Sequence, residues 1–209
     1  LYYNNSSRLQ TTNTGAHVTG DLYADHMYID DYLYHAGNTT TRIGFGTNTI
    51  YMRTAGVDRL TINSSGKITM PAIPCFFAYR NSGVTWNTAT TAIVFNAADV
   101  DNGGHYSGTN GRYTAPVTGY YAFHAQGLHR KINGNGTVEP SFYQNNGNVS
   151  TRGMGFSHMT DTDEQTCRIH MVHQLNSSQY VTHGLHSINS VTDYYYGERL
   201  GNFSGYLLG

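Results

Sequence analysis

The sequence predicts an all-β protein with two parts, a short β-rich stalk followed by a larger β-sandwich head. The 209 residues include 24 Gly and 18 Tyr but only 4 Pro, and Asn and Thr are frequent. Gly and Asn favour tight turns, while Tyr and Thr suit half-buried strands. No long segment repeats apolar residues at helical spacing. We therefore expect many short strands joined by turns, with little helix.

The two parts meet at a proline-containing joint. The segment Met70-Pro71-Ala72-Ile73-Pro74 contains two prolines within four residues. Proline lacks a backbone donor and disfavours helix in the residue before it, so this joint is stiff and non-helical. We assign residues 1–74 to the stalk and residues 75–209 to the head.

The stalk contains an internal repeat. Residues 8–15 and 59–66 both read Arg-Leu, five further residues and Gly, and each copy continues into a short β-like segment, 16–19 or 67–70. This pattern predicts a strand-turn-strand unit. Such short strands bury little apolar surface and leave open edges, so we expect three chains to wrap about one axis. A disordered polar linker is the alternative, and the regular placement of Ile, Leu, Tyr and Met argues against it.

The head is long enough to form its own core. Turn signals separate several apolar segments, as in a β-sandwich. The candidate strands are Phe76–Tyr79, Ala92–Phe95, Tyr120–Ala125, Arg168–His173, Gln179–Thr182 and Phe203–Leu208.

One spacing pattern in the head is specific. The residues Phe95, Asp101, Tyr106, Tyr113 and Gly119 follow one another at intervals of six, five, seven and six positions. Tyr121 and Phe123 then occupy alternate positions of the next segment. With segments 111–121 and 203–208, this pattern resembles the C1q/TNF-like globular head, over essentially all of Cys75 to Gly209. The resemblance implies a jelly-roll sandwich that forms a homotrimer. Tyr113 stands where Phe is usual, and Ala125 replaces a usual aromatic, so one core contact must be filled differently.

The stalk resembles the shaft repeats of bacteriophage tail fibres, especially those of phages of marine bacteria, over residues 1–11 and 48–66. No Gly recurs at every third position, so a collagen stalk is absent. We therefore interpret the chain as the receptor-binding tip of a tail fibre or spike, extracellular on the virion. The rest of the fibre would join its N-terminal end, and the head would bind a host surface polysaccharide or protein. A secreted C1q-like lectin or ligand and a structural virion decoration protein are the alternatives.

Composition and motifs argue against several other functions. Only 12% of the residues are charged and the formal net charge is −1, which does not favour nucleic acid as a partner. No apolar run is long enough for insertion into a membrane. The chain begins at Leu1 without a secretory signal, so we expect a fragment or a processed product. A polysaccharide hydrolase would need two convergent carboxylates, and no catalytic motif is present, so we expect no enzyme activity.

The histidines and cysteines are expected to be structural. His170 and His173, and likewise His183 and His186, are three residues apart, which in a strand directs the two rings to opposite faces. We therefore expect no metal site from these pairs. Cys75 and Cys167 are too few for a disulfide framework, and we expect free thiols, with a single pairing as the alternative.

No cofactor is expected. The densest acidic cluster is Asp161-Thr162-Asp163-Glu164, where oxygen ligands in a loop would suit a Ca²⁺ ion held by Asp161 and Asp163. The spacing is not that of an EF-hand, and a solvated acidic turn is the favoured interpretation.

The receptor site is predicted at the free tip of the head. In the resembled fold, the loops that follow outward-running strands lie there, after the first strand from Asn81, at 130–137, at 158–164 and at 187–199. Three adjacent tyrosines in the last loop cannot all face a core, and Tyr suits sugar or protein recognition. The alternative is that Tyr194 and Tyr196 pack inward and brace the trimer. The predicted binding residues are Arg130, Lys131, His158, Asp161, Asp163, Glu164, Asp193, Tyr194, Tyr195, Tyr196, Glu198 and Arg199.

Overall fold

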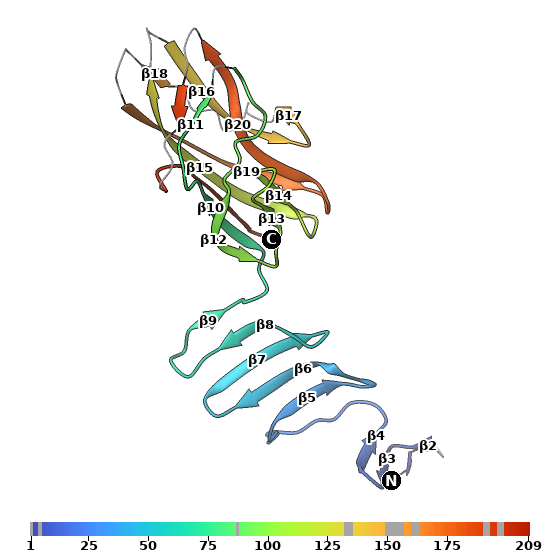
Figure 1. Ribbon diagram of the computed structural model, residues 1–209. Coiled ribbons are helices and arrows are strands. Elements are labelled where there is room, and N and C mark those ends of the chain that lie inside the picture. The colour runs from blue at the N-terminus through green and yellow to red at the C-terminus, as the bar shows by residue number, and fades with distance from the viewer. Residues whose placement is uncertain are drawn as a thin grey trace. The chain divides into compact units, whose positions relative to one another are not determined.

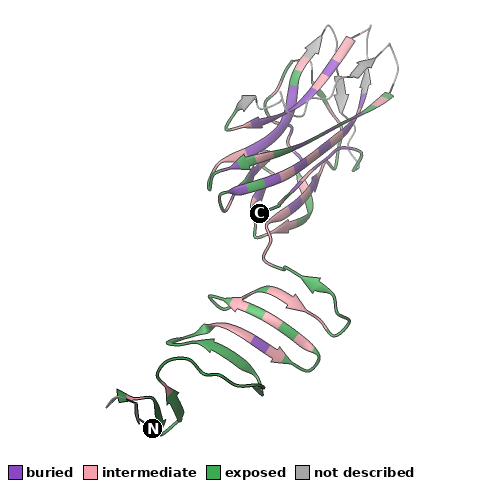
Figure 2. Ribbon diagram, turned by 180° about the vertical axis from the view of Figure 1, so that it is seen from behind, coloured by how far each residue is buried: buried purple, intermediate pink, exposed green. Residues whose placement is uncertain are grey.

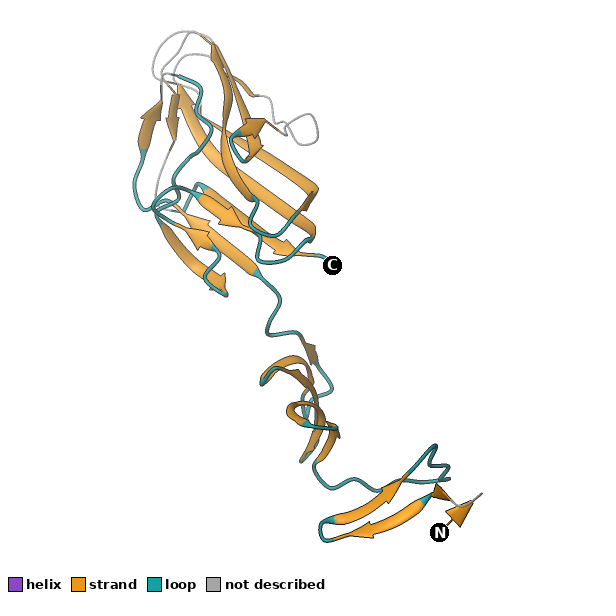
Figure 3. Ribbon diagram, turned by 90° about the vertical axis from the view of Figure 1, so that its right-hand side faces the viewer, coloured by secondary structure: helices purple, strands orange, loops and turns teal. Residues whose placement is uncertain are grey.

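The computed structural model describes residues 2–3, 6–86, 88–131, 136–148, 157–159, 164–189, 193–195 and 199–209. All regular structure within these residues is β-strand (Figure 1, Figure 3). The chain divides into two compact units, Leu1–Thr69 and Met70–Gly209. The first unit is called the stalk unit below and the second the head.

The stalk unit consists of antiparallel hairpins and one meander. Strands β1 (Tyr2–Tyr3) and β2 (Ser6–Ser7) pair, as do β3 (Leu9–Thr12) and β4 (Gly15–Val18). A five-stranded sheet follows in chain order, made of β5 (Tyr32–His35), β6 (Asn38–Gly46), β7 (Thr49–Thr54), β8 (Val57–Ile62) and β9 (Ile68–Thr69).

Both copies of the predicted repeat are strand-turn-strand units. The first copy forms the β3–β4 hairpin and the second forms the β8–β9 hairpin. In the second turn the side-chain Oδ1 of Asn63 accepts hydrogen bonds from the backbone of Ser65 and Lys67, both at 3.0 Å. Gly66 in this turn has φ +76°, a left-handed conformation that glycine adopts without steric cost. The prediction of strands and turn at these positions is confirmed.

The five-stranded sheet has one apolar face. Its register aligns Leu33, Ile43, Met52 and Leu60 in one row and Phe45, Ile50, Ile62 and Ile68 in the next. Alternation along a strand places both rows on the same side of the sheet. These side chains are exposed or only half-buried, because no second layer from the described part of this unit covers them (Figure 2).

The opposite face of this sheet is polar and aromatic. The guanidinium carbon of Arg42 lies 4.4 Å from the ring centre of Tyr32 and 5.8 Å from those of Tyr34 and Tyr51. The Tyr51 ring lies against Gly44, where a Cβ atom would overlap it. These contacts give the side chains of the polar face partners within one chain. The side chains of the apolar face are not covered by the described residues of this unit.

The head is a sandwich of two antiparallel sheets. The seven-stranded sheet contains β10 (Cys75–Tyr79), β11 (Val84–Trp86), β12 (Ala97–Asn102), β15 (Gly119–Lys131), β19 (Glu164–Leu175), β21 (Asp193–Tyr195) and β22 (Asn202–Leu207). The six-stranded sheet contains β13 (Tyr106–Ser107), β14 (Arg112–Thr114), β16 (Gly136–Gln144), β17 (Gly147–Asn148), β18 (Ser157–Met159) and β20 (Tyr180–Asn189). Strand β15 lies inside the first sheet and pairs with β19 along one edge. Along its other edge it pairs with β22 over residues 121–126 and with β21 over residues 129–131.

Aromatic rings fill the space between the two sheets. Phe76 of β10 stacks on Tyr113 of β14, with ring centres 4.6 Å apart, and meets Phe203 of β22 edge-on at 4.8 Å. Phe123 and Phe142 complete the centre of the core, both almost fully buried. Gly205 leaves room for this packing, because a Cβ there would lie 2.6 Å from the Phe123 ring.

The residues of the specific spacing pattern support turns and core. Oδ1 of Asp101 accepts hydrogen bonds from the backbone N–H groups of His105 and Tyr106, at 2.9 and 3.1 Å, and so closes one turn. The hydroxyl of Tyr106 donates to the carbonyl of Phe95 at 2.9 Å. Tyr113 and Ala125 are fully buried, so Tyr and Ala fill these core positions.

The strand prediction for the head needs one correction and several additions. Residues 92–95 were predicted to be a strand, but they form none. Ile93 and Phe95 are nevertheless fully buried, and the Ile93 N–H donates to the His183 carbonyl at 2.7 Å. An apolar segment can therefore cover the core without joining a ladder. The other five predicted segments lie in β10, β15, β19, β20 and β22, except that Gln179 precedes β20 and Leu208 follows β22.

Candidate functional site

Backbone pairing gathers six of the twelve predicted binding residues at one end of the seven-stranded sheet. Arg130 lies directly opposite Glu164 of β19 on one side and Tyr194 of β21 on the other. Lys131 lies opposite Asp193 in the same ladder. These residues, with Tyr195, are called the strand-end group below. In the head, this end lies away from the chain's C-terminus (Figure 1).

The sequence prediction described these residues as loops, and this part needs correction. Arg130 and Lys131 complete β15, Glu164 begins β19, and Asp193–Tyr195 forms β21. His158 lies in β18 of the other sheet, opposite Thr137. At this end the residues pair with the edges of neighbouring strands, and this pairing provides hydrogen-bond partners for their backbone N–H and C=O groups. Their role in receptor binding stays a prediction.

Four predicted residues, Asp161, Asp163, Tyr196 and Glu198, lie outside the described residues. Arg199 does not join the strand-end group. Its guanidinium forms an ion pair with Asp99 and stacks over the Tyr79 ring at 4.1 Å. Arg199 also has φ +70°, and its N–H donates to the Arg80 carbonyl at 3.1 Å. These contacts give Arg199 a local structural role beside β10 and β12.

The seven-stranded sheet also exposes a second surface, its outer face. Outward positions of β15, β19 and β22 form rows across the sheet: Ala122, Val172 and Tyr206 in one row, His124, His170 and Ser204 in the next, then Gln126 and Arg168. Tyr120, Val172 and Tyr206 are each more than half exposed, at 54%, 57% and 52%. A soluble chain rarely exposes such neighbouring apolar groups unless they meet a partner.

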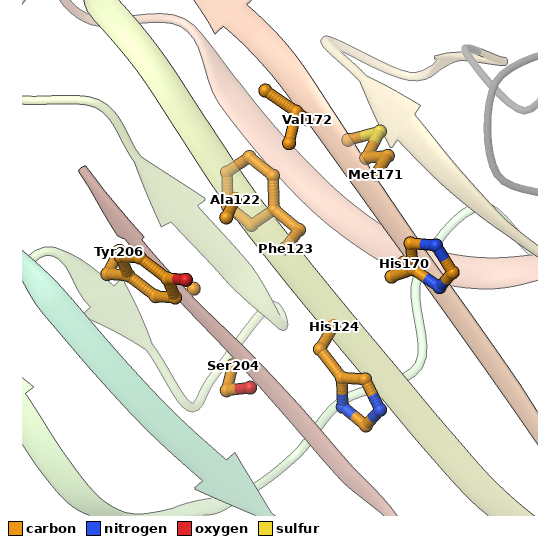
Figure 4. A pocket seen from close by; sticks show the side chains of 9 residues that line it. Ala122, Phe123, His124, His170, Met171, Val172, Ser204 and Tyr206 are labelled. Carbon is orange, nitrogen blue, oxygen red and sulfur yellow. The ribbon is translucent and has the colours of Figure 1, made fainter. Parts of the chain in front are cut away.

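A shallow hollow of about 200 Å³ lies on this face (Figure 4). Side chains of β15, β19 and β22 line it, and the residues are Ala122, Phe123, His124, His170, Met171, Val172, Ser204, Gly205 and Tyr206. Apolar groups and two imidazoles thus surround it, with one hydroxyl from Ser204 and one from Tyr206. This lining lacks the convergent carboxylates that glycosidase chemistry needs.

The paired histidines of this hollow were missed by the sequence prediction. His124 and His170 are far apart in the chain, and only the β15–β19 register places them opposite each other. Burial lowers the pKa of His124, and the positive charge of Arg168 and the nearby His170 lower it further. The prediction that His170 and His173 point to opposite faces of their strand is confirmed. The His173 ring faces the other sheet, and its Nε2 lies 2.9 Å from Oε1 of Gln144.

The cysteines of the head have the state predicted for them. Cys75 is half-buried and Cys167 is buried, and both are free thiols, as predicted. Among the residues that the structure describes, no three His, Cys, Asp or Glu side chains form a group that could hold a metal. The suggested calcium residues Asp161 and Asp163 lie outside this set. No helix in the described ranges is long and apolar enough to cross a membrane.

Comparison with known proteins agrees with this sandwich. The C1q domain family model matches residues 75–208. The globular domain of zebrafish complement 1qA is 17% identical, with a TM-score of 0.51 over 65% of this chain and 98% of that chain. The Eiger TNF structure from S. frugiperda is 8% identical, with a TM-score of 0.53 over 66% and 94%. No curated protein sequence matches the chain. Because the family model covers more than half of the residues, the chain belongs to the C1q domain family.

Proposed function

We propose that this protein is a homotrimeric receptor-binding tip of a bacteriophage tail fibre or spike. The C1q domain would bind a host surface glycan or protein, and the stalk unit would connect the head to the rest of the fibre. The observation that carries the proposal is the combination of a C1q head with a β-sheet stalk unit that leaves one apolar face uncovered.

Assembly follows from the two exposed apolar faces. In the stalk unit, Leu33, Met52 and Ile68 remain 51%, 46% and 63% exposed in one chain. In the head, the outer face exposes Tyr120 and Tyr206. Burying apolar surface stabilises by about 25 cal/mol per Å², so contact between copies would remove both patches from water. Three copies about one axis use the same patch on every chain and close the assembly.

The strand-end group is the proposed receptor surface. It combines cationic, acidic and tyrosine residues where β15, β19 and β21 meet. Tyrosine offers an apolar ring with a hydrogen-bonding hydroxyl, and Arg and Asp offer polar contacts to sugars or peptide groups. This surface lies at the opposite end of the head from the C-terminal residues of β22, so attachment at one end and binding at the other are compatible.

Two experiments test the proposal. Light scattering on the purified chain at micromolar concentration should give three times the monomer mass of 23.1 kDa. A folded monomer would contradict the assembly. The fluorescently labelled protein is then applied to an array of bacterial surface polysaccharides, to intact bacteria and to animal cells. Binding to either supports the proposal, and binding only to animal cell proteins would instead favour a secreted C1q-like ligand.

A further inference from the structure

Imidazole rings occupy the middle of the outer face. His124 of β15 lies directly opposite His170 of β19, and Ser204 of β22 lies opposite His124 on its other side. Directly opposite residues of antiparallel strands hold their Cβ atoms about 4.5–5.5 Å apart, so the two rings are neighbours. Figure 4 shows both side chains beside the apolar group of Val172 and Tyr206.

The groups around this pair do not favour additional positive charge. Arg168 is the next outward residue of β19, and the neighbours on β22 are Ser204 and Tyr206, which are neutral. Beneath the sheet, the buried His183 of β20 interacts unfavourably with a charged His124. Arg168 and His170 both lower the pKa of His124, and no carboxylate contributes among the groups that shift it.

We propose that acidification weakens the trimer by protonating the His124–His170 pair at the contact between subunits. This inference rests on the proposed trimer, whose copies would meet through the outer face. Contact with other copies removes water from the two rings, and a desolvated imidazole holds a proton less readily. Separated chains leave the pair better hydrated than the contact does, so the pair accepts protons more readily there. Protons therefore bind preferentially to the separated chains, and low pH favours dissociation.

The expected effect is large because every subunit contributes. If assembly lowers the pKa of one imidazole per chain by about one unit, the trimer dissociation constant rises by up to about 10-fold for each chain, or about 1000-fold in all, as the pH falls below both values. The pH dependence of the dissociation constant also gives the number of protons taken up when the trimer dissociates. The slope of the logarithm of this constant against pH should reach at most about 1.6 protons per trimer, about half a proton for each chain, midway between the two pKa values.

Fluorescence-detected sedimentation of the full chain over a dilution series measures the dissociation constant. Runs at pH 7.5, 6.5, 5.5 and 5.0 are paired with circular dichroism, which identifies the range in which the head stays folded. The double variant His124→Gln, His170→Gln stays neutral at every pH, and we expect its constant to change less than about five-fold. The matched control His186→Gln alters an exposed histidine of the six-stranded sheet and should keep the full wild-type effect.

The single variant His170→Gln keeps the test usable if the double variant does not fold, because His170 is exposed in one chain. It should give a smaller acid effect than the wild type, because one of the two imidazoles is lost from each chain. A folded wild-type trimer with the same dissociation constant at pH 7.5 and 5.0 would overturn the inference. So would a double variant that dissociates in acid like the wild type. A wild-type monomer at pH 7.5 would instead overturn the proposed trimer itself.

Discussion

The buried ring of His183 predicts that the folded head loses stability in acid. This residue of β20 is 1% exposed, and its ring centre lies 5.9 Å from those of Phe95 and Phe142. Its Nδ1 lies 3.2 Å from the Ser141 carbonyl oxygen. Burial lowers the pKa of His183 to about 3, with a further lowering from the nearby His129. In an unfolded chain the same ring has a pKa of about 6.5.

The direction and size of the effect follow from these two values. Because the folded pKa is the lower one, the unfolded chain binds the proton first as the pH falls. Stability is therefore complete above about pH 6.5, declines as the pH falls from 6.5 to about 3, and declines no further below that. At pH 5.0 the loss is about 2 kcal/mol. Domains are typically stable by about 5–15 kcal/mol, so this loss is measurable.

Denaturant unfolding at pH 7.5 and pH 5.0 tests the prediction with wild-type protein and a His183→Phe variant. Phe fits among the neighbouring aromatic rings and does not titrate. Protomer concentration is held constant, since assembly also contributes to apparent stability. Between the two pH values the wild type should lose about 2 kcal/mol more than the variant. His186→Gln, at an exposed position of the same strand, should behave like the wild type. Equal losses in wild type and His183→Phe would refute the reasoning.

Three further predictions concern the stalk unit, metal dependence and the receptor. Met52→Lys places a charge on the apolar face of the five-stranded sheet and should raise the trimer dissociation constant more than 10-fold. The control Tyr34→Lys, on the opposite face, should not raise it. Equal effects of the two variants would contradict the assignment of faces. EDTA should change the melting temperature by less than about 2 °C, and a large drop would point to a calcium site. Replacing Tyr195, Asp161 and Asp163 together by Ala should weaken binding to host cells with little change in melting temperature; normal binding would exclude this end of the head.

Local patterns in the sequence were enough to predict the class of fold and the strands of the stalk repeat. Alternating residues such as Tyr121 and Phe123 identify a strand with one face in the core, and both are buried. The same reasoning was wrong for residues 92–95, because burial of Ile93 and Phe95 does not require ladder pairing. Strand β12 was missed, since Ala97–Asn102 contains few apolar residues and is held mainly by its pairing with β10.

The candidate site was less predictable because it depends on register between distant segments. Nothing local marks Asp193 and Tyr194 as strand residues, and they become so by pairing with Lys131 and Arg130 of β15. His124 and His170 likewise meet only through the β15–β19 ladder. A search of the sequence for nearby histidines finds pairs three residues apart, which a strand separates. Opposite positions on paired strands give no such local signal.

The residues that identify the family differ from those that we propose for receptor specificity. Asp101 closes a turn, Tyr106 bonds the Phe95 carbonyl, and Phe123 packs in the core, so the pattern that identifies the C1q domain supports the sandwich itself. The strand-end group contains none of these residues. It lies where the ends of β15, β19 and β21 pair, and we expect changes there to cost the fold less than changes in the aromatic core. Under the proposed receptor-binding function, the strand-end group is where we expect specificity to reside.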